Sequence, residues 1–170
     1  MGETLSKRLN LQVNGCPIIL NDKLNESKLL QHKIKKVGFF ERLIMGKYSS
    51  NDVIYWSKNC ELEFLNNETD YFTITPVLDP SMGAEMLCGT SAYLFFKKNI
   101  LYNFSFQIIN SKRSAKAYLR IFEEGLIKLM GHIVSSDEMF KIWESDTERL
   151  VLQYPDNNIP NGYISFMLKE

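Results

Sequence analysis

Residues 122–143, FEEGLIKLMGHIVSSDEMFKIW, contain the pattern on which the predicted fold is built. They end a helix at Met130 and Gly131, cross a polar loop with a Ser-Ser-Asp, and enter a strand at a tryptophan. Residues 37–56, VGFFERLIMGKYSSNDVIYW, pass through the same steps in the same order. Such a recurrence predicts internal duplication of a β-α-β-β-β unit. The predicted repeat units span residues 9–78 and 91–169 and are joined by the loop 79–90.

Apolar residues recur at steps of three and four in two parts of the chain, which is typical of amphipathic helices. The predicted helices cover residues 25–45, with Gly38 interrupting or dividing the segment, and residues 111–130. Strand patterns occupy most of the remaining sequence. The predicted fold class is therefore α+β, a largely antiparallel sheet with two helices packed on one face, in a single compact domain over residues 1–170.

Alternating apolar and polar residues predict hairpins that turn at Asn14-Gly15 and at Lys98-Asn99. Antiparallel meanders of three strands are expected over residues 53–77 and 139–168. The last strand of the second hairpin is expected to bury one set of alternate residues, namely Ile100, Tyr102, Phe104, Phe106 and Ile108. Both tryptophans, Trp56 and Trp143, are expected to pack in the core where helix meets sheet. An exposed tryptophan would instead be a binding anchor.

Charge and hydropathy disfavour several kinds of partner. The chain has 20 basic and 20 acidic residues, whereas a nucleic-acid-binding protein normally has a basic face. No apolar run approaches the roughly 18–20 residues that span a bilayer. The N-terminal residues lack the apolar segment of a secretion signal, so a cytoplasmic location is expected. We therefore expect neither nucleic acid nor a membrane as partner.

Residues that perform catalysis or bind metals are sparse. The three cysteines, Cys16, Cys60 and Cys88, lack metal-site spacing and are interpreted as reduced thiols. The two histidines, His32 and His132, belong to no zinc-binding motif, and phosphate-binding and dinucleotide-binding glycine motifs are absent. No cofactor or metal is predicted. Enzyme activity ranks third among the hypotheses, because it needs His132, Cys88 and an acid within hydrogen-bonding reach.

The leading functional hypothesis is a small non-catalytic protein, possibly of inhibitor or immunity type, that recognises another protein through sheet and loop surfaces. Loops on a rigid scaffold often carry recognition, and the two expected to do so here are residues 82–88 and the long hairpin loop of residues 155–161. Residues 76–90 are irregular but apolar, so they either pack against the sheet edge or form an adaptable contact surface. A homodimer is compatible with the same surfaces. The predicted partner-binding residues are Met82, Met86, Leu87, Asp156, Asn157 and Asn158.

The alternative hypothesis is a small-molecule or lipid binder. It requires an apolar cavity between helices and sheet, lined by Tyr93, Phe95, Phe104 and Phe106. Ligand pockets usually enclose about 300–1,000 Å³. A filled core at that place would remove this hypothesis.

Residues 45–56 and 130–143 contain a helix that ends in glycine, a polar loop and a strand with a tryptophan. This combination resembles the repeated module of the β-lactamase inhibitor protein family. The resemblance implies tandem units that form a curved sheet whose concave face grips a partner protein. The chain departs from that family in lacking a signal peptide and paired cysteines, so neither export nor the family's target is implied.

Overall fold

The structure is a computed structural model of the 170-residue chain. The residues that it describes are 9–45, 52–65, 71–74, 89–109, 112–130, 135–136, 139–156 and 161–169.

Two antiparallel sheets and three helices make up the described part of the chain. The strands of the larger sheet are β3 (Lys35–Lys36), β4 (Val53–Lys58), β7 (Gly89–Lys97), β8 (Ile100–Ile109), β9 (Ser135–Ser136), β10 (Phe140–Glu144), β11 (Glu148–Gln153) and β12 (Gly162–Leu168). Their order in the sheet is β3-β4-β7-β8-β12-β11-β10-β9. The strands of the smaller sheet are β1 (Gln12–Val13), β2 (Cys16–Pro17), β5 (Leu62–Leu65) and β6 (Tyr71–Ile74), in the order β2-β1-β5-β6. The helices are α2 (Glu26–Gln31), α3 (Phe39–Met45) and α4 (Lys112–Met130).

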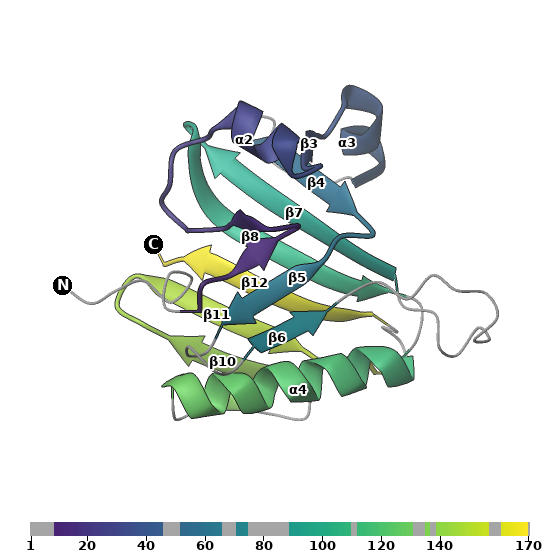
Figure 1. The fold of residues 1–170 in the computed structure, drawn as a ribbon, viewed down its shortest axis with the longest axis vertical. Helices are drawn as coiled ribbons and strands as arrows, with labels where there is room; N and C mark the ends of the chain where they lie inside the picture. Colours follow the sequence, from purple (N-terminus) through teal and green to yellow (C-terminus); the bar gives the residue numbers. More distant parts are fainter. Residues whose placement is uncertain are drawn as a thin grey trace.

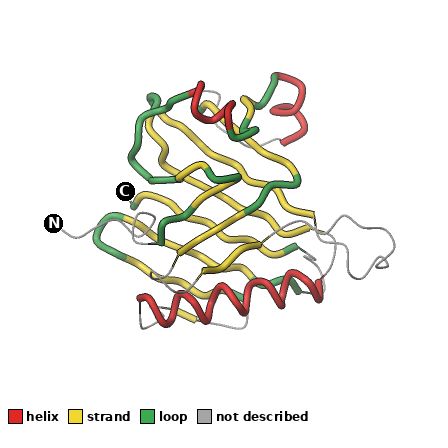
Figure 2. Tube along the Cα trace, in the orientation of Figure 1, coloured by secondary structure: helices red, strands yellow, loops and turns green. Residues whose placement is uncertain are grey.

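The smaller sheet lies across one face of the larger sheet, and α4 runs along one side of this stack (Figure 1). Helices α2 and α3 lie at the opposite end of the molecule from α4 (Figure 2). We call the face of the larger sheet toward the smaller sheet the inner face, and the opposite face the outer face. The predicted α+β class with antiparallel sheets is confirmed.

The main hydrophobic core fills the space between the inner face, the smaller sheet and α4. Phe104 of β8 lies directly opposite Phe166 of β12, with ring centroids 6.3 Å apart, and both side chains are fully buried. Fully burying a large apolar side chain contributes about 1.5–3 kcal/mol. The opposite wall of this core is formed by buried residues of the smaller sheet and α4, namely Val13, Leu62, Leu119, Phe122 and Leu126.

The cross-strand register separates the two tryptophans. Trp143 is 2% exposed and lies opposite Leu150 on the inner face, so its predicted core position is confirmed. Trp56 is only partly buried and packs in a second cluster on the outer face. The prediction that both tryptophans are core residues is therefore wrong for Trp56. Successive residues of a strand point to opposite faces, and it is Tyr55, one position earlier, that enters the main core.

A β-bulge changes the predicted alternation of β8. Phe95 pairs with Asn103 but Phe96 pairs with Leu101, so Tyr102 has no residue opposite it in β7. Such an extra residue shifts the alternation by one position. Leu101 is consequently 3% exposed in the main core, while Tyr102 packs in the outer cluster. The predicted buried set is correct from Phe104 onward and wrong at its beginning.

The segment predicted as one helix over residues 25–45 is divided into α2, the short strand β3 and α3. Asn25 caps α2 by accepting a hydrogen bond from the backbone N–H of Lys28. After α2, Lys33 has a positive φ of 60°, which turns the chain out of the helix. The β-branched residues Ile34 and Val37 are then buried, and Val37 donates a backbone hydrogen bond to Ile54 of β4. Extended pairing with β4 therefore replaces the middle of the predicted helix.

The two predicted repeat units differ in their strand pairing. Strands β10, β11 and β12 form the predicted meander in the larger sheet. In the first unit the β1–β2 hairpin and the β5–β6 pair form as predicted, but β4 joins β3 and β7 in the larger sheet and does not pair with β5. The meander predicted over residues 53–77 is therefore wrong in its first strand. Duplication is not shown by this arrangement.

Asn14 connects the smaller sheet to the larger one. It occupies the predicted turn with Gly15, and their positive φ values of 51° and 80° match a two-residue type I′ hairpin. Its amide nitrogen Nδ2 donates to the carbonyl of His32 (2.9 Å) and to Oγ of Ser57 (3.0 Å). Its Oδ1 accepts from the backbone N–H of Glu61 (2.9 Å). One side chain thus holds the end of α2, β4 and the residue before β5.

We expect Asn14→Gly to lower the free energy of unfolding by about 2–3 kcal/mol, because it leaves partly buried hydrogen-bonding groups unsatisfied. Glycine keeps the positive φ accessible, so backbone strain does not contribute. Urea denaturation of both proteins measures the difference. The matched control is Asn99→Gly, which changes an exposed turn asparagine with φ 63° and should cost much less. Equal costs for the two variants would show that the Asn14 side chain does not join the sheets.

Candidate functional site

Most of the predicted partner-binding residues lie outside the described part of the structure. These are Met82, Met86, Leu87, Asn157 and Asn158. Asp156 is described, follows β11 and is partly buried. Cys88 and His132, which the enzyme hypothesis needs, also lie outside the described residues.

The described cysteine and histidine side chains are buried or hydrogen-bonded within the fold. His32 places Nδ1 2.9 Å from the backbone carbonyl of Asn14 and so supports the turn. Cys16 and Cys60 are both about 1% exposed. Burial raises the pKa of Cys60 to about 11, against smaller lowering effects of hydrogen bonds from Thr90 and the backbone. Burial also raises the pKa of Cys16, while nearby Lys28 lowers it. Neither thiol is prepared to act as a nucleophile.

In a Cys88→Ser background, we expect Cys16 and Cys60 to react with Ellman's reagent at pH 8 at least roughly 100-fold more slowly in the native protein than in urea. The reason is that burial both blocks access and disfavours the thiolate. Release of the coloured thiolate product measures the rate. Native and unfolded protein reacting at similar rates would contradict the buried positions.

The described residues contain no group of three or more His, Cys, Asp or Glu side chains arranged to hold a metal ion. Among the described helices, none is long and apolar enough to cross a bilayer.

The cavity predicted for the small-molecule alternative does not have the predicted lining. Leu94 pairs with Phe104 and Ala92 with Phe106, so these residues point to the inner face. Tyr93 and Phe95 pair with Ser105 and Asn103 and therefore point to the outer face. Phe104 and Phe106 are fully buried in the packed core. Because the four aromatic residues lie on opposite faces of one sheet, they cannot line one cavity, and this part of the prediction is wrong.

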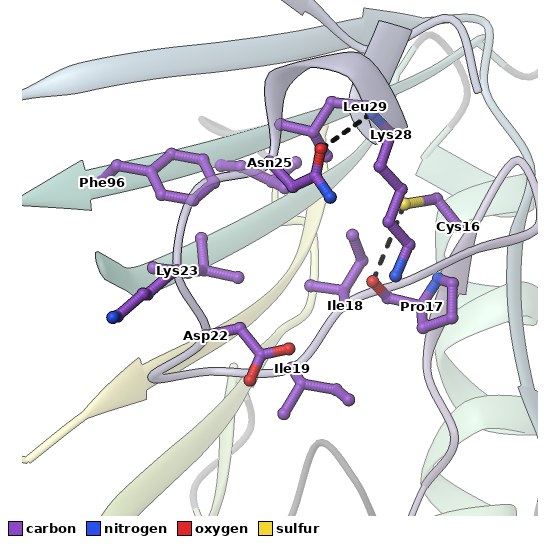
Figure 3. A pocket seen from close by; sticks show the side chains of 12 residues that line it. Cys16, Pro17, Ile18, Ile19, Asp22, Lys23, Asn25, Lys28, Leu29 and Phe96 are labelled. Carbon is purple, nitrogen blue, oxygen red and sulfur yellow. Dashed lines mark hydrogen bonds between the residues drawn. The ribbon is translucent and has the colours of Figure 1, made fainter. Parts of the chain in front are cut away.

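A pocket of about 190 Å³ lies between α2 and the segment that precedes it. Exposed polar side chains surround its opening, namely Asp22, Lys23, Asn25 and Lys28 (Figure 3). Its apolar floor includes Leu29, Phe96 and Leu101, each exposing 6% or less of its surface. The pocket is smaller than the usual ligand pocket of about 300–1,000 Å³. It offers little apolar surface for a lipid or a drug-sized molecule.

The outer face carries a continuous row of paired residues across the larger sheet. The row joins one residue from each strand, namely Lys35, Trp56, Tyr93, Ser105, Ser165, Val151, Ile142 and Ser135. From Trp56 to Ile142 its members are partly exposed. The corresponding inner row of Tyr55, Leu94, Phe104, Phe166, Leu150 and Trp143 is at most 2% exposed. The larger sheet thus has one buried face and one face that is accessible along this row.

Aromatic residues gather at the β4–β7–β8 end of the outer face. The ring centroids of Trp56 and Tyr93 are 6.3 Å apart, and those of Phe95 and Tyr102 are 6.5 Å apart. Their apolar base consists of Val37, Ile54 and Phe95, which are 4%, 1% and 3% exposed. Trp56, Tyr93 and Tyr102 cover this base and remain partly exposed.

Lysines surround the aromatic cluster. Lys58 places Nζ 4.3 Å from the centroid of the Trp56 ring, and Lys97 places Nζ 6.0 Å from that of Tyr102. Lys35 lies opposite Trp56 in the neighbouring strand, and all three lysines are exposed. We call the six residues Trp56, Tyr93, Tyr102, Lys35, Lys58 and Lys97 the lysine–aromatic surface. Cations over aromatic rings are attracted by the ring quadrupole, which orders both groups before any partner arrives.

Asp52 holds the bulged residue of this surface in position. It directly precedes β4, is 5% exposed, and accepts a hydrogen bond from the hydroxyl of Tyr102 at 2.5 Å. The carboxylate is therefore engaged by the protein itself. Farther along the outer face, Gln107 donates to the hydroxyl of Tyr163 (3.1 Å), and the hydroxyls of Ser105 and Ser165 lie 3.5 Å apart. These polar pairs continue the accessible face beyond the aromatic cluster.

Two phenylalanines at the start of α3 are also exposed. Phe39 and Phe40 are 72% and 76% exposed, with ring centroids 5.8 Å apart. They follow the edge strand β3, and α3 lies beside β3 and β4 (Figure 1). An amphipathic helix over residues 25–45 would bury one of these phenylalanines on its apolar face, whereas in the structure both are exposed.

Part of the lysine–aromatic surface could be predicted from the sequence. An exposed tryptophan is expected to be a binding anchor, and the cross-strand register decides that this tryptophan is Trp56. Strand β7 contains apolar residues on both of its faces, Leu94 and Phe96 inward and Tyr93 and Phe95 outward, which indicates a second cluster. Tyr102 could not be found, because its orientation depends on the bulge opposite Phe95 and Phe96.

No protein-family model matches the chain, and neither the curated proteins nor the solved structures contain a significant match. The resemblance to the β-lactamase inhibitor protein family therefore stays a prediction.

Proposed function

We propose that this chain is a small partner-binding protein of the inhibitor or immunity type, which acts by recognition and not by catalysis. The lysine–aromatic surface on the outer face is the observation that carries the proposal. Tryptophan and tyrosine are enriched among residues that dominate binding energies, and they act where a partner excludes water from them. Here two such rings, Trp56 and Tyr93, lie side by side on a rigid strand pair.

The composition of the outer face supports the same proposal. Protein interfaces combine an aromatic centre with a polar rim that supplies hydrogen bonds. The aromatic cluster at β4 and β7 is continuous with hydroxyl and amide groups on β8 and β12, namely Ser105, Gln107, Tyr163 and Ser165. A broad sheet face of this kind is a better binding surface for another protein than for a small ligand. The pocket beside α2 supports the small-molecule alternative less, because its apolar floor is almost completely covered.

We expect Trp56→Ala to reduce capture of a native protein partner at least about tenfold, because it removes the central ring of the surface. The measurement is affinity capture of the tagged chain from the cells that express it, followed by quantitative mass spectrometry of stoichiometric partners. The side chain is partly exposed, so the variant should keep the wild-type circular dichroism spectrum.

Ile121→Ala is the matched control. It shortens an apolar side chain that is 49% exposed on α4, and capture should be unchanged. A partner retained equally by the Trp56 and Ile121 variants would refute this surface as the binding site. If native mass spectra showed a bound small molecule and capture gave no protein, the small-molecule alternative would replace the proposal.

A further inference from the structure

The charged side chains of the lysine–aromatic surface are all positive. Lys35, Lys58 and Lys97 are exposed, and within the described part of the chain no carboxylate lies at salt-bridge distance from any of them. The acid beside the cluster, Asp52, is buried and bonded to Tyr102. By contrast, Arg149 and Lys169 at the far end of the sheet both pair with Glu144.

This local excess of positive charge is not a property of the whole chain, whose formal net charge is zero. A partner that approaches the surface meets three cations around partly exposed aromatic rings. Complementary charge across an interface accelerates encounter and selects the correct partner. Lys58 is already ordered against Trp56, so little further side-chain freedom is lost when it meets a carboxylate.

From this arrangement we infer that the lysine–aromatic surface recognises an acidic polypeptide segment that carries aromatic or aliphatic side chains between its carboxylates. The inference rests on the proposed partner-binding function and names the chemistry of the partner. The carboxylates meet Lys35, Lys58 and Lys97, and the apolar side chains contact Trp56 and Tyr93.

A polypeptide fits this surface better than other anions do. Proteins that bind nucleic acids through phosphates commonly use about 6–10 cationic contacts, which is more than the three lysines supply. Proteins that insert into a bilayer surface do so with rings that project from an amphipathic element. The rings of Trp56, Tyr93 and Tyr102 instead lie half-buried against the sheet.

The probe for this inference is a fluorescein-labelled random copolymer of glutamate and tyrosine, with polyglutamate and a lysine–tyrosine copolymer as comparisons. We expect the wild-type chain to bind the glutamate–tyrosine copolymer in preference to both, and binding should weaken from about 50 to about 300 mM NaCl as exposed charges are screened. Fluorescence anisotropy measures each affinity. Equal binding of polyglutamate would show that the aromatic rings take no part and would overturn the inference.

The test variant is Lys58→Glu with Lys97→Glu, for which we expect at least about tenfold weaker binding of the copolymer. The control is Lys23→Glu with Lys28→Glu, which changes the net charge equally at exposed lysines beside the α2 pocket, and should alter binding less than about twofold. Lys58→Gln with Lys97→Gln should give an intermediate loss and guards against misfolding of the first variant. Equal losses in test and control variants would indicate non-specific charge attraction and overturn the inference.

Two outcomes separate this inference from the proposed function. If Trp56→Ala loses the native partner while the Lys58 and Lys97 variant keeps it, the surface binds a partner but the acidic chemistry is wrong. If no native partner exists, the proposed function fails whatever the copolymer does. Binding to phosphatidylserine vesicles that exceeds copolymer binding, and that the Lys58 and Lys97 variant abolishes, would overturn the inference in favour of a membrane surface.

Discussion

The hydrogen bonds of the Asn14 carboxamide are the constraint on which the stacking of the two sheets depends. Residues 18, 43 and 47 positions away in the sequence converge on this side chain, namely His32, Ser57 and Glu61. Asparagine suits this position for two reasons. It tolerates a positive φ, and its side chain supplies both donor and acceptor groups. Beside α4, Tyr154 donates to the carboxylate of Glu123 in that helix. Burial raises the pKa of the Tyr154 phenol most, and the hydrogen bond with Glu123 raises this pKa further. The phenol therefore stays protonated, and its contact with α4 persists, in alkaline solution.

Once the sheets are stacked, the register of the larger sheet determines which side chains remain accessible. The inner row from Tyr55 to Trp143 is buried, and the outer row beginning at Lys35 and Trp56 is displaced by one residue on every strand. A shift of one residue exchanges the faces of a strand completely. The bulge at Tyr102 makes such a shift within β8. As a result, Leu101 points into the core and Tyr102 points toward the accessible aromatic cluster.

Several polar and titratable side chains of the described residues are held by contacts within the fold. Asp52 holds Tyr102, His32 supports a turn, Thr90 donates to the carbonyl of Cys60, and the thiols of Cys16 and Cys60 are buried. At the β4–β7–β8 end of the outer face, the accessible groups include the aromatic rings and lysines of the lysine–aromatic surface. The proposed binding of an acidic segment uses these groups without requiring any of the structural ones to move.

The sequence by itself determined the α+β class of this protein and part of its local structure. Both hairpin turns, the long helix α4 and the meander of β10 to β12 were predictable, because turn chemistry and apolar periodicity act between residues that are close in the chain. Only the tertiary structure decided that β4 pairs with β7 and not with β5, and that β3 divides the predicted first helix. It also decided that Trp56 faces outward while Trp143 is buried. The physical reason is that pairing and burial depend on contacts between distant segments, and these contacts override local propensity. The lysine–aromatic surface belongs to this second group, since its residues come from β3, β4, β7 and β8 and meet only in the folded sheet.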